Sequence, residues 1–170
     1  PASGTVVNHG ETVSFEATVS DAEDAPDEVE LEWTSSVDGV LSSDSADSSG
    51  TARLDVATLT AGTHTITLSA TDTDGFDTTD SLTLRVNETP SAPVVSISPS
   101  APESTDSLTA VILTDAVDPE GETITYSYEW EVGGVVSTAS TTSILSSSDT
   151  TKGEIWSVNV TPNDGTGDGE

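Results

Sequence analysis

The sequence of 170 residues has no cysteine and no methionine, only two histidines and only three basic residues. Without cysteine the chain forms neither a disulfide nor a thiolate metal site, and two histidines do not suffice for a typical zinc centre. No stretch reaches the about 18 apolar residues of a membrane-spanning helix, and none has the pattern of a signal peptide. A chain without cysteine and methionine tolerates oxidation, which suits an exposed surface. We therefore expect a mature fragment of a longer extracellular or cell-surface protein, with no membrane insertion.

The charge of the chain is strongly one-sided. The chain has 31 acidic residues and only three basic ones, Arg53, Arg85 and Lys152, which gives a formal net charge of −28. Nucleic acids and anionic membranes bind basic surfaces, so neither is expected as a partner. So many like charges also repel one another in a compact fold, and either salt or bound divalent cations would relieve that repulsion. Solubility in a salty habitat is the simpler explanation for most of these acids.

Residues 1–88 alternate between apolar and polar residues with a period of two, which predicts short β-strands. Turn sequences such as Asp38-Gly39 and Asp74-Gly75 separate these strands, and the polar stretch Ser42–Gly50 is expected to be a loop. No segment keeps a helical period. The block predicts an antiparallel β-sandwich of about seven strands. The apolar strand positions include Val13, Phe15, Ala17, Val29, Leu31, Trp33, Leu54, Val56, Ile66, Leu68, Leu82, Leu84 and Val86.

Residues 89–170 repeat this plan, which is the strongest sign of domain organisation in the chain. Trp130 takes the place of Trp33, and the stretch 161–165 corresponds to 71–75. The first block continues beyond this stretch with one more strand, whereas the sequence ends shortly after it in the second. The second sandwich therefore lacks its last strand within this sequence. Either the chain was cut there or another chain supplies the strand.

A proline-containing stretch, Val86–Val94, joins the two blocks and includes Pro90 and Pro93. Proline fixes φ and has no backbone donor, so this stretch is neither a helix nor a central strand. We expect a short, stiff and extended joint between one domain, 1–88, and a second, 89–170.

Several motifs carry a family resemblance. Through Trp33, Asp38-Gly39 and the stretch 62–75, the first block resembles PKD-like and other Ig-like repeats of bacterial surface proteins. Through the stretches 118–126 and 161–165 the second block resembles the same group, and the joint is similar to the linkers of cadherin-like repeats. The resemblance implies an all-β fold of two tandem Ig-like sandwiches, the second one incomplete. It says little about function, because such modules serve as spacers, adhesins and enzyme appendages.

Oxygen-bearing side chains gather at the predicted joint. In such a sandwich the loops at one end of the second domain face the joint, together with a turn of the first domain. Hard divalent cations bind about six to eight oxygens, so we predict a Ca²⁺ site that rigidifies the joint. A solvated acidic loop is the alternative. The predicted ligands at the joint are Glu11, Asn87, Glu88, Asp115, Asp118, Glu120, Glu122 and Asp164.

The corresponding loops at the other end of the first domain predict an equivalent site, where a preceding repeat would follow on. The run 72–77 is similar to a calcium loop, but it lacks the spacing and the distal glutamate of an EF-hand. A glycine-containing hairpin turn, with acids for solubility, is the simpler explanation. The predicted ligands at this end are Asp21, Glu23, Asp24, Asp72, Asp74 and Asp77.

Nothing in the sequence marks a catalytic centre, and we expect no enzyme. His9 and His64 are the only imidazoles, and no serine lies in a nucleophile-elbow pattern. His64 stands where PKD-like repeats often have a tyrosine, and its inward position favours a hydrogen-bonded histidine at the edge of the core. A sugar-binding platform is conceivable, but the inward period of the aromatic residues favours the core. Those residues are Tyr126, Tyr128, Trp130 and Trp156.

Together these features favour a structural and adhesive repeat module of an extracellular stalk, adhesin or fibre, with Ca²⁺ at its joint. Its partners would be neighbouring repeats of the same or another chain, and a surface glycan or protein receptor. Two alternatives stay open. One is a carbohydrate-binding or spacer module of a secreted hydrolase, and the other is a filament subunit completed by strand donation.

Overall fold

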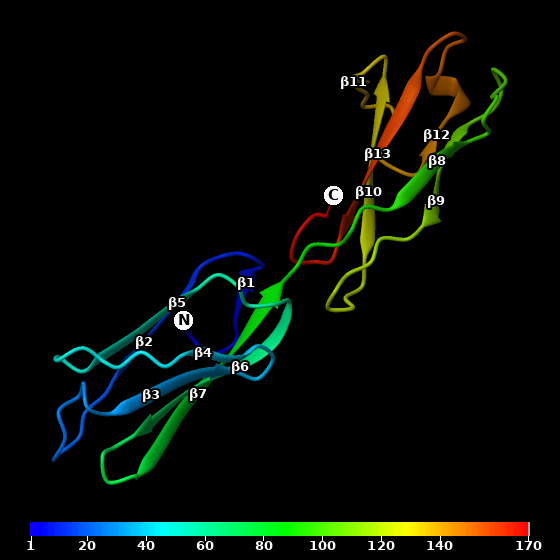
Figure 1. Cartoon of the computed structure of the whole chain (residues 1–170). Helices are drawn as coiled ribbons and strands as arrows, with labels where there is room; N and C mark the ends of the chain where they lie inside the picture. The colour runs from blue at the N-terminus through cyan, green and yellow to red at the C-terminus, as the bar shows by residue number, and fades with distance from the viewer. Residues whose placement is uncertain (170) are drawn as a thin grey trace. The chain divides into compact units, whose positions relative to one another are not determined.

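The computed structural model describes residues 1–169, which form β-strands and one short 3₁₀ turn, η1 (Ser147–Asp149). The chain divides into two compact units, Pro1–Glu88 and Thr89–Glu170, here called unit 1 and unit 2 (Figure 1). Within the described part of the chain no helix is long and apolar enough to cross a membrane. The predicted all-β class is confirmed.

The strands of unit 1 are β1 (Thr5–Asn8), β2 (Val13–Thr18), β3 (Glu30–Ser35), β4 (Gly39–Ser42), β5 (Thr51–Val56), β6 (Gly62–Thr71) and β7 (Asp77–Asn87). The strands of unit 2 are β8 (Val94–Ser98), β9 (Leu108–Thr114), β10 (Thr125–Val132), β11 (Val135–Val136), β12 (Ile144–Leu145) and β13 (Trp156–Asn163).

Unit 1 has a five-stranded sheet in the order β1-β7-β6-β3-β4 and a second sheet in which β2 pairs with β5. The long strand β6 lies inside the larger sheet, antiparallel to β3 on one side and to β7 on the other. β1 pairs with β7 in parallel, with Thr5 opposite Leu84 and Asn8 opposite Asn87. The other strand pairs of unit 1 are antiparallel, as predicted, and β1 is the exception. This strand has only four residues, too few for a period-two pattern to show, and it lies at the edge of the sheet.

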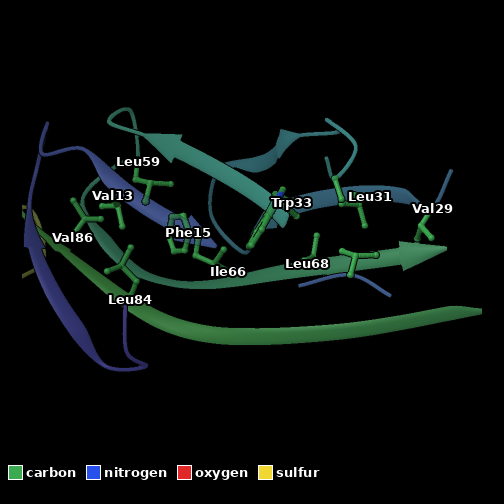
Figure 2. Close-up of a cluster of buried hydrophobic side chains, with 13 residues drawn as sticks. Val13, Phe15, Val29, Leu31, Trp33, Leu59, Ile66, Leu68, Leu84 and Val86 are labelled. Carbon is green, nitrogen blue, oxygen red and sulfur yellow. The ribbon is translucent and has the colours of Figure 1, made fainter. Parts of the chain in front are cut away.

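The core of unit 1 forms where the alternating apolar residues of the two sheets meet (Figure 2). Trp33 from β3 packs against Phe15 from β2, with ring centroids 5.9 Å apart and a tilted angle of 41°. Leu84 and Val86 from β7 are buried in the same core. Ala46 is buried too, although it lies in the stretch predicted, correctly, to be a loop. Burial of this apolar surface is the main term that stabilises the unit.

Unit 2 has two three-stranded sheets, in the orders β11-β10-β13 and β12-β9-β8 (Figure 1). β10 and β13 pair antiparallel over eight residues, from Thr125 opposite Asn163 to Val132 opposite Trp156. Trp130 is fully buried, and its indole N–H donates to the carbonyl of Thr142 at 2.9 Å. The buried residues of this smaller core are Leu108, Ala110, Trp130 and Leu145.

Candidate metal centre

The loop between β9 and β10 turns sharply around the sequence Asp118-Pro-Glu-Gly-Glu122. The carbonyl of Asp118 accepts a hydrogen bond from the N–H of Gly121 at 3.2 Å, and Asp118 Oδ1 accepts one from the N–H of Glu122 at 2.9 Å. Gly121 has a φ of 79°, which glycine adopts without the strain that a side chain would bring. The turn thus brings three acidic side chains to one side of the loop.

Asp118, Glu120 and Glu122 form the acidic cluster. Each offers a carboxylate oxygen, and these oxygens all lie within 4.8 Å of one another. Glu120 and Glu122 are half-buried, whereas Asp118 is only 7% exposed. Asp118 Oδ2 is buried and has no hydrogen-bond partner among residues 1–169. A buried carboxylate oxygen without a donor is costly, and three carboxylates this close together could hold a metal ion.

Two other predicted ligands of unit 2 hold the surrounding backbone. Asp115 Oδ1 accepts from the hydroxyl of Tyr126 at 3.3 Å, and this hydroxyl accepts from the N–H of Ala116 at 2.9 Å. Asp164, which is 7% exposed, accepts through Oδ1 from the N–H groups of Thr166 and Gly167 at 2.6 and 2.7 Å. These contacts fix the loops, and the structure does not place either carboxylate in the acidic cluster.

The predicted joint ligands of unit 1 lie near the ends of β1 and β7. Glu11 Oε2 accepts from the N–H of Asn8 at 3.2 Å within a turn. Asn87 is 1% exposed, and its Oδ1 accepts from the guanidinium of Arg85 at 2.7 Å. Glu88 Oε2 lies 3.8 Å from Nδ1 of His9, with both side chains nearly half exposed. Their part in binding an ion stays a prediction.

At the other end of unit 1 the predicted ligands lie in two loops, and one side chain links them. Asp24 accepts from the N–H and the hydroxyl of Thr73, at 3.0 and 2.8 Å. Asp72 and Asp77 cap their own hairpin, accepting from the N–H of Phe76 and the hydroxyl of Thr71.

Asp21 caps its loop in the same manner. The backbone N–H of Asp24, followed by that of Glu23, holds the pKa of Asp21 below its usual range. Glu23 and Asp74 are exposed. Among residues 1–169, no group of three acids as close as the acidic cluster forms here, so an ion site at this end stays a prediction.

A hydrogen-bonded network around His64 was only partly visible in the sequence. His64 is fully buried, as its inward position predicts. Its Nε2–H donates to the carbonyl of Thr60 at 2.7 Å, because a carbonyl only accepts. The hydroxyl of Ser35 lies 2.8 Å from Nδ1 and accepts from the N–H groups of Val37 and Asp38, both at 3.1 Å. The histidine thus makes a bond to the backbone, and its partner Ser35 carries no sequence signal.

An open groove of about 500 Å³ lies in unit 2 between the β8–β9 loop and the segment before β13. Trp156 lines it, and its indole N–H donates to Glu154 Oε2 at 3.0 Å. Glu154 also accepts from the N–H of Thr151 at 2.6 Å, which fixes the carboxylate. Lys152, the only lysine of the chain, lines the same groove.

Comparison with known proteins agrees with the two-sheet architecture. Residues 1–68 match the family model of the bacterial Ig domain. The predicted resemblance to Ig-like repeats of bacterial surface proteins is thereby confirmed, and the match lies within the β-sandwich of unit 1. No curated protein matches the chain.

Three solved structures are similar to the whole chain. The fibronectin(III)-like modules of Clostridium thermocellum CbhA are 18% identical with a TM-score of 0.42, covering 100% of this chain and 86% of the other. Murine CEACAM1b is 12% identical with a TM-score of 0.39, covering 98% and 93%. A 1.5-MDa bacterial ice-binding adhesin is 16% identical with a TM-score of 0.36, covering 97% of this chain and 58% of the other.

Proposed function

We propose that the chain is a structural and adhesive repeat module of an extracellular stalk, adhesin or fibre, and that the acidic cluster binds Ca²⁺. The family match of residues 1–68 supports the structural role. Ion binding is supported mainly by Asp118 Oδ2, a buried carboxylate oxygen that has no donor among the described residues and lies beside two further carboxylates. Oxygen-only ligands of this charge suit a hard divalent cation.

The acidic cluster has a direct connection to the proline-containing stretch. Ser91 lies between Pro90 and Pro93, and its N–H donates to the carbonyl of Val117 at 3.0 Å. In return, the N–H of Val117 donates to the hydroxyl of Ser91 at 2.9 Å. Val117 immediately precedes Asp118. An ion that fixes the loop of Asp118 therefore also fixes the start of unit 2, which is how ion binding would stiffen the joint predicted from the sequence.

Thermal melting with and without Ca²⁺ tests this proposal. After removal of ions with EDTA, Ca²⁺ at a hundred times its dissociation constant should stabilise unit 2 by about 2.7 kcal/mol. In a domain of this size that corresponds to roughly 11–22 °C in Tm. Mg²⁺ should act more weakly, because it requires a tighter octahedral site.

Asp118→Asn is the decisive variant. It should abolish the Ca²⁺-dependent shift while leaving the ion-free Tm equal or higher, because it removes a buried charge. Glu129→Gln is the matched control, since this exposed residue of β10 carries the same charge and lies outside the acidic cluster. Equal Ca²⁺ responses of parent and Asp118→Asn would remove the ion from the proposal but leave the structural role.

A second candidate function, a saccharide-binding module of a secreted hydrolase, is favoured by the groove beside Trp156. Its volume is within the usual range for ligand sites, and a tryptophan that is hydrogen-bonded to a neighbouring carboxylate lines it. Titration with neutral oligosaccharides should then change the tryptophan fluorescence, and Lys152→Ala should weaken binding. Fluorescence that stays constant for parent and variant would exclude this function.

A further inference from the structure

β13 is paired on one side only. It pairs with β10 along all eight of its residues. On the opposite side, the described residues make backbone contacts only at the end of the strand, where Asn163 pairs with Asp168 and the N–H of Gly169 donates to the carbonyl of Pro162 at 2.8 Å. Its counterpart in unit 1, β6, is paired on both sides. In unit 2 one side of β13 thus leaves backbone groups unpaired among the described residues, whereas β7 pairs with the corresponding side of β6 in unit 1 (Figure 1).

The free side of β13 lacks the usual protection of a sheet edge. Natural edge strands carry charged residues, prolines or bulges that prevent pairing with another strand. β13 has no charged residue, although the chain has 31 acids, and its only proline lies at the end that already pairs. Trp156, Val158 and Val160 alternate along it and are only half-buried. These are the properties of a strand that accepts another one.

The turn after β13 directs the chain back along this side. Asp164 accepts from two N–H groups of the turn, and its own N–H donates to the carbonyl of Gly167 at 3.3 Å. Asn163 Nδ2 donates to Asp168 Oδ1 at 2.7 Å, which fixes the pairing. Gly169 lies so close to the carbonyl of Pro90 and the ring of Pro162 that a Cβ would overlap with them. Residues 164–169 are therefore the start of an antiparallel hairpin.

We propose that the free side of β13 binds one antiparallel strand that continues this hairpin, formed by a segment joined to Glu170. The register follows from the pairing of Asn163 with Asp168. The first, third and fifth residues of the segment would lie opposite Val160, Val158 and Trp156 and point into the core, as Leu84 and Val86 do in unit 1. The segment should therefore be apolar at these positions and polar between them.

Backbone direction gives a second consequence. The carbonyl of Pro162 points toward the free side, and alternate residues of a strand point the same way. The N–H groups of Val158 and Val160 therefore point toward the free side as well, whereas that of Asn159 points toward β10. Strand binding should slow amide exchange at Val158 and Val160 and leave Asn159 unchanged.

Two extended chains of equal composition test the proposal. The in-register variant carries Val-Thr-Val-Thr-Val-Thr-Thr after Glu170, and the shifted variant carries Thr-Val-Thr-Val-Thr-Val-Thr. In EDTA, so that no ion contributes, the in-register variant should raise the Tm of unit 2. It should also slow exchange at Val158 and Val160 by about tenfold or more relative to the parent. The shifted variant should do neither, and both should stay monomeric in sedimentation.

Three results would overturn the proposal. Equal Tm values and equal exchange rates in the two variants would show that β13 does not bind a strand in a defined register. Slow exchange at Val158 and Val160 in the parent would show that this side is already covered. Stabilisation that appears only with dimers or polymers would show that the strand is donated by a second chain. Because these measurements contain no Ca²⁺, their outcome is independent of the ion site.

Discussion

Units 1 and 2 have a similar arrangement of strands, but they differ in how many apolar side chains they bury. Among the described residues, the core of unit 1 has 13 buried apolar residues, from both sheets and from loops, and that of unit 2 has four. The strand neighbours account for part of this difference. In unit 1, β7 covers the free side of β6 and adds Leu84 and Val86 to the core, each 1% exposed. In unit 2 the same side of β13 is open among the described residues, and the apolar residues of β13 remain half-buried.

We expect the strand beside β6 to add stability to unit 1 that unit 2 lacks beside β13. Apolar burial scales with the area removed from water, at about 25 cal/mol per Å². A unit that buries fewer apolar side chains has a smaller margin over the entropy of the unfolded chain. We therefore expect two separate thermal transitions in the ion-free protein, with unit 2 unfolding at the lower temperature.

The largest expected effect comes from the tryptophans that occupy equivalent positions in the two cores. Trp130→Ala should cost about 3–5 kcal/mol and eliminate the lower transition, because this ring fills most of the small core of unit 2. Trp33→Ala should cost about as much but only lower the upper transition, since a larger core remains. Differential scanning calorimetry in EDTA measures both. Loss of the upper transition in Trp33→Ala, with both transitions intact in Trp130→Ala, would contradict the comparison.

The sequence predicted the repeat and most strands because period-two alternation is a local property of the chain. It did not predict β1, whose pairing depends on β7 being placed first. The acidic cluster was predictable as three acids within five residues, 118–122. The burial of Asp118 was not predictable, and neither was the lack of a hydrogen-bond partner for its Oδ2 among the described residues. Both depend on how the β9–β10 loop packs.

The acids at the other end of unit 1 show the same limit from the opposite direction. Asp21, Asp24, Asp72 and Asp77 have the composition of an ion site, yet each accepts hydrogen bonds from loop N–H or hydroxyl groups. Sequence alone does not distinguish a carboxylate that caps a turn from one that binds a cation, since both roles favour aspartate beside glycine.

A medium effect is expected from Ser35 in unit 1, where a polar network reaches the core. Ser35→Ala removes the partner of His64 Nδ1 and the acceptor for two backbone N–H groups. Buried groups left without partners should cost about 1–3 kcal/mol and lower the upper transition only. Ser14→Ala, an exposed serine of β2, is the control and should change little. A shift of the lower transition by Ser35→Ala would show that the units do not unfold separately.

The smallest effect concerns Asp47, an exposed acid of unit 1 whose Oδ1 is surrounded by donors. The Ser49 hydroxyl, followed by the N–H of Thr51, holds the pKa of Asp47 below its ordinary value of 3.8. Since the folded pKa is the lower one, the ionised carboxylate stabilises unit 1 above pH 3.8, and this contribution is lost as the pH falls through the folded pKa. Asp47→Asn should therefore lower the upper transition at pH 7, and the difference from the parent should vanish on acidification.

Asp55→Asn, in the adjacent strand β5, removes the same charge and serves as the control for the net charge of the chain. Its effect should not follow the pH profile of Asp47→Asn. Asp47→Asn and Asp118→Asn should change the stability of the ion-free protein in opposite directions. Asp47→Asn removes a carboxylate that hydrogen-bond donors stabilise, whereas Asp118→Asn removes a carboxylate with a buried oxygen that has no donor among the described residues. If both substitutions destabilise the ion-free protein at pH 7, Asp118 is stabilised by the fold itself and has no need of a cation.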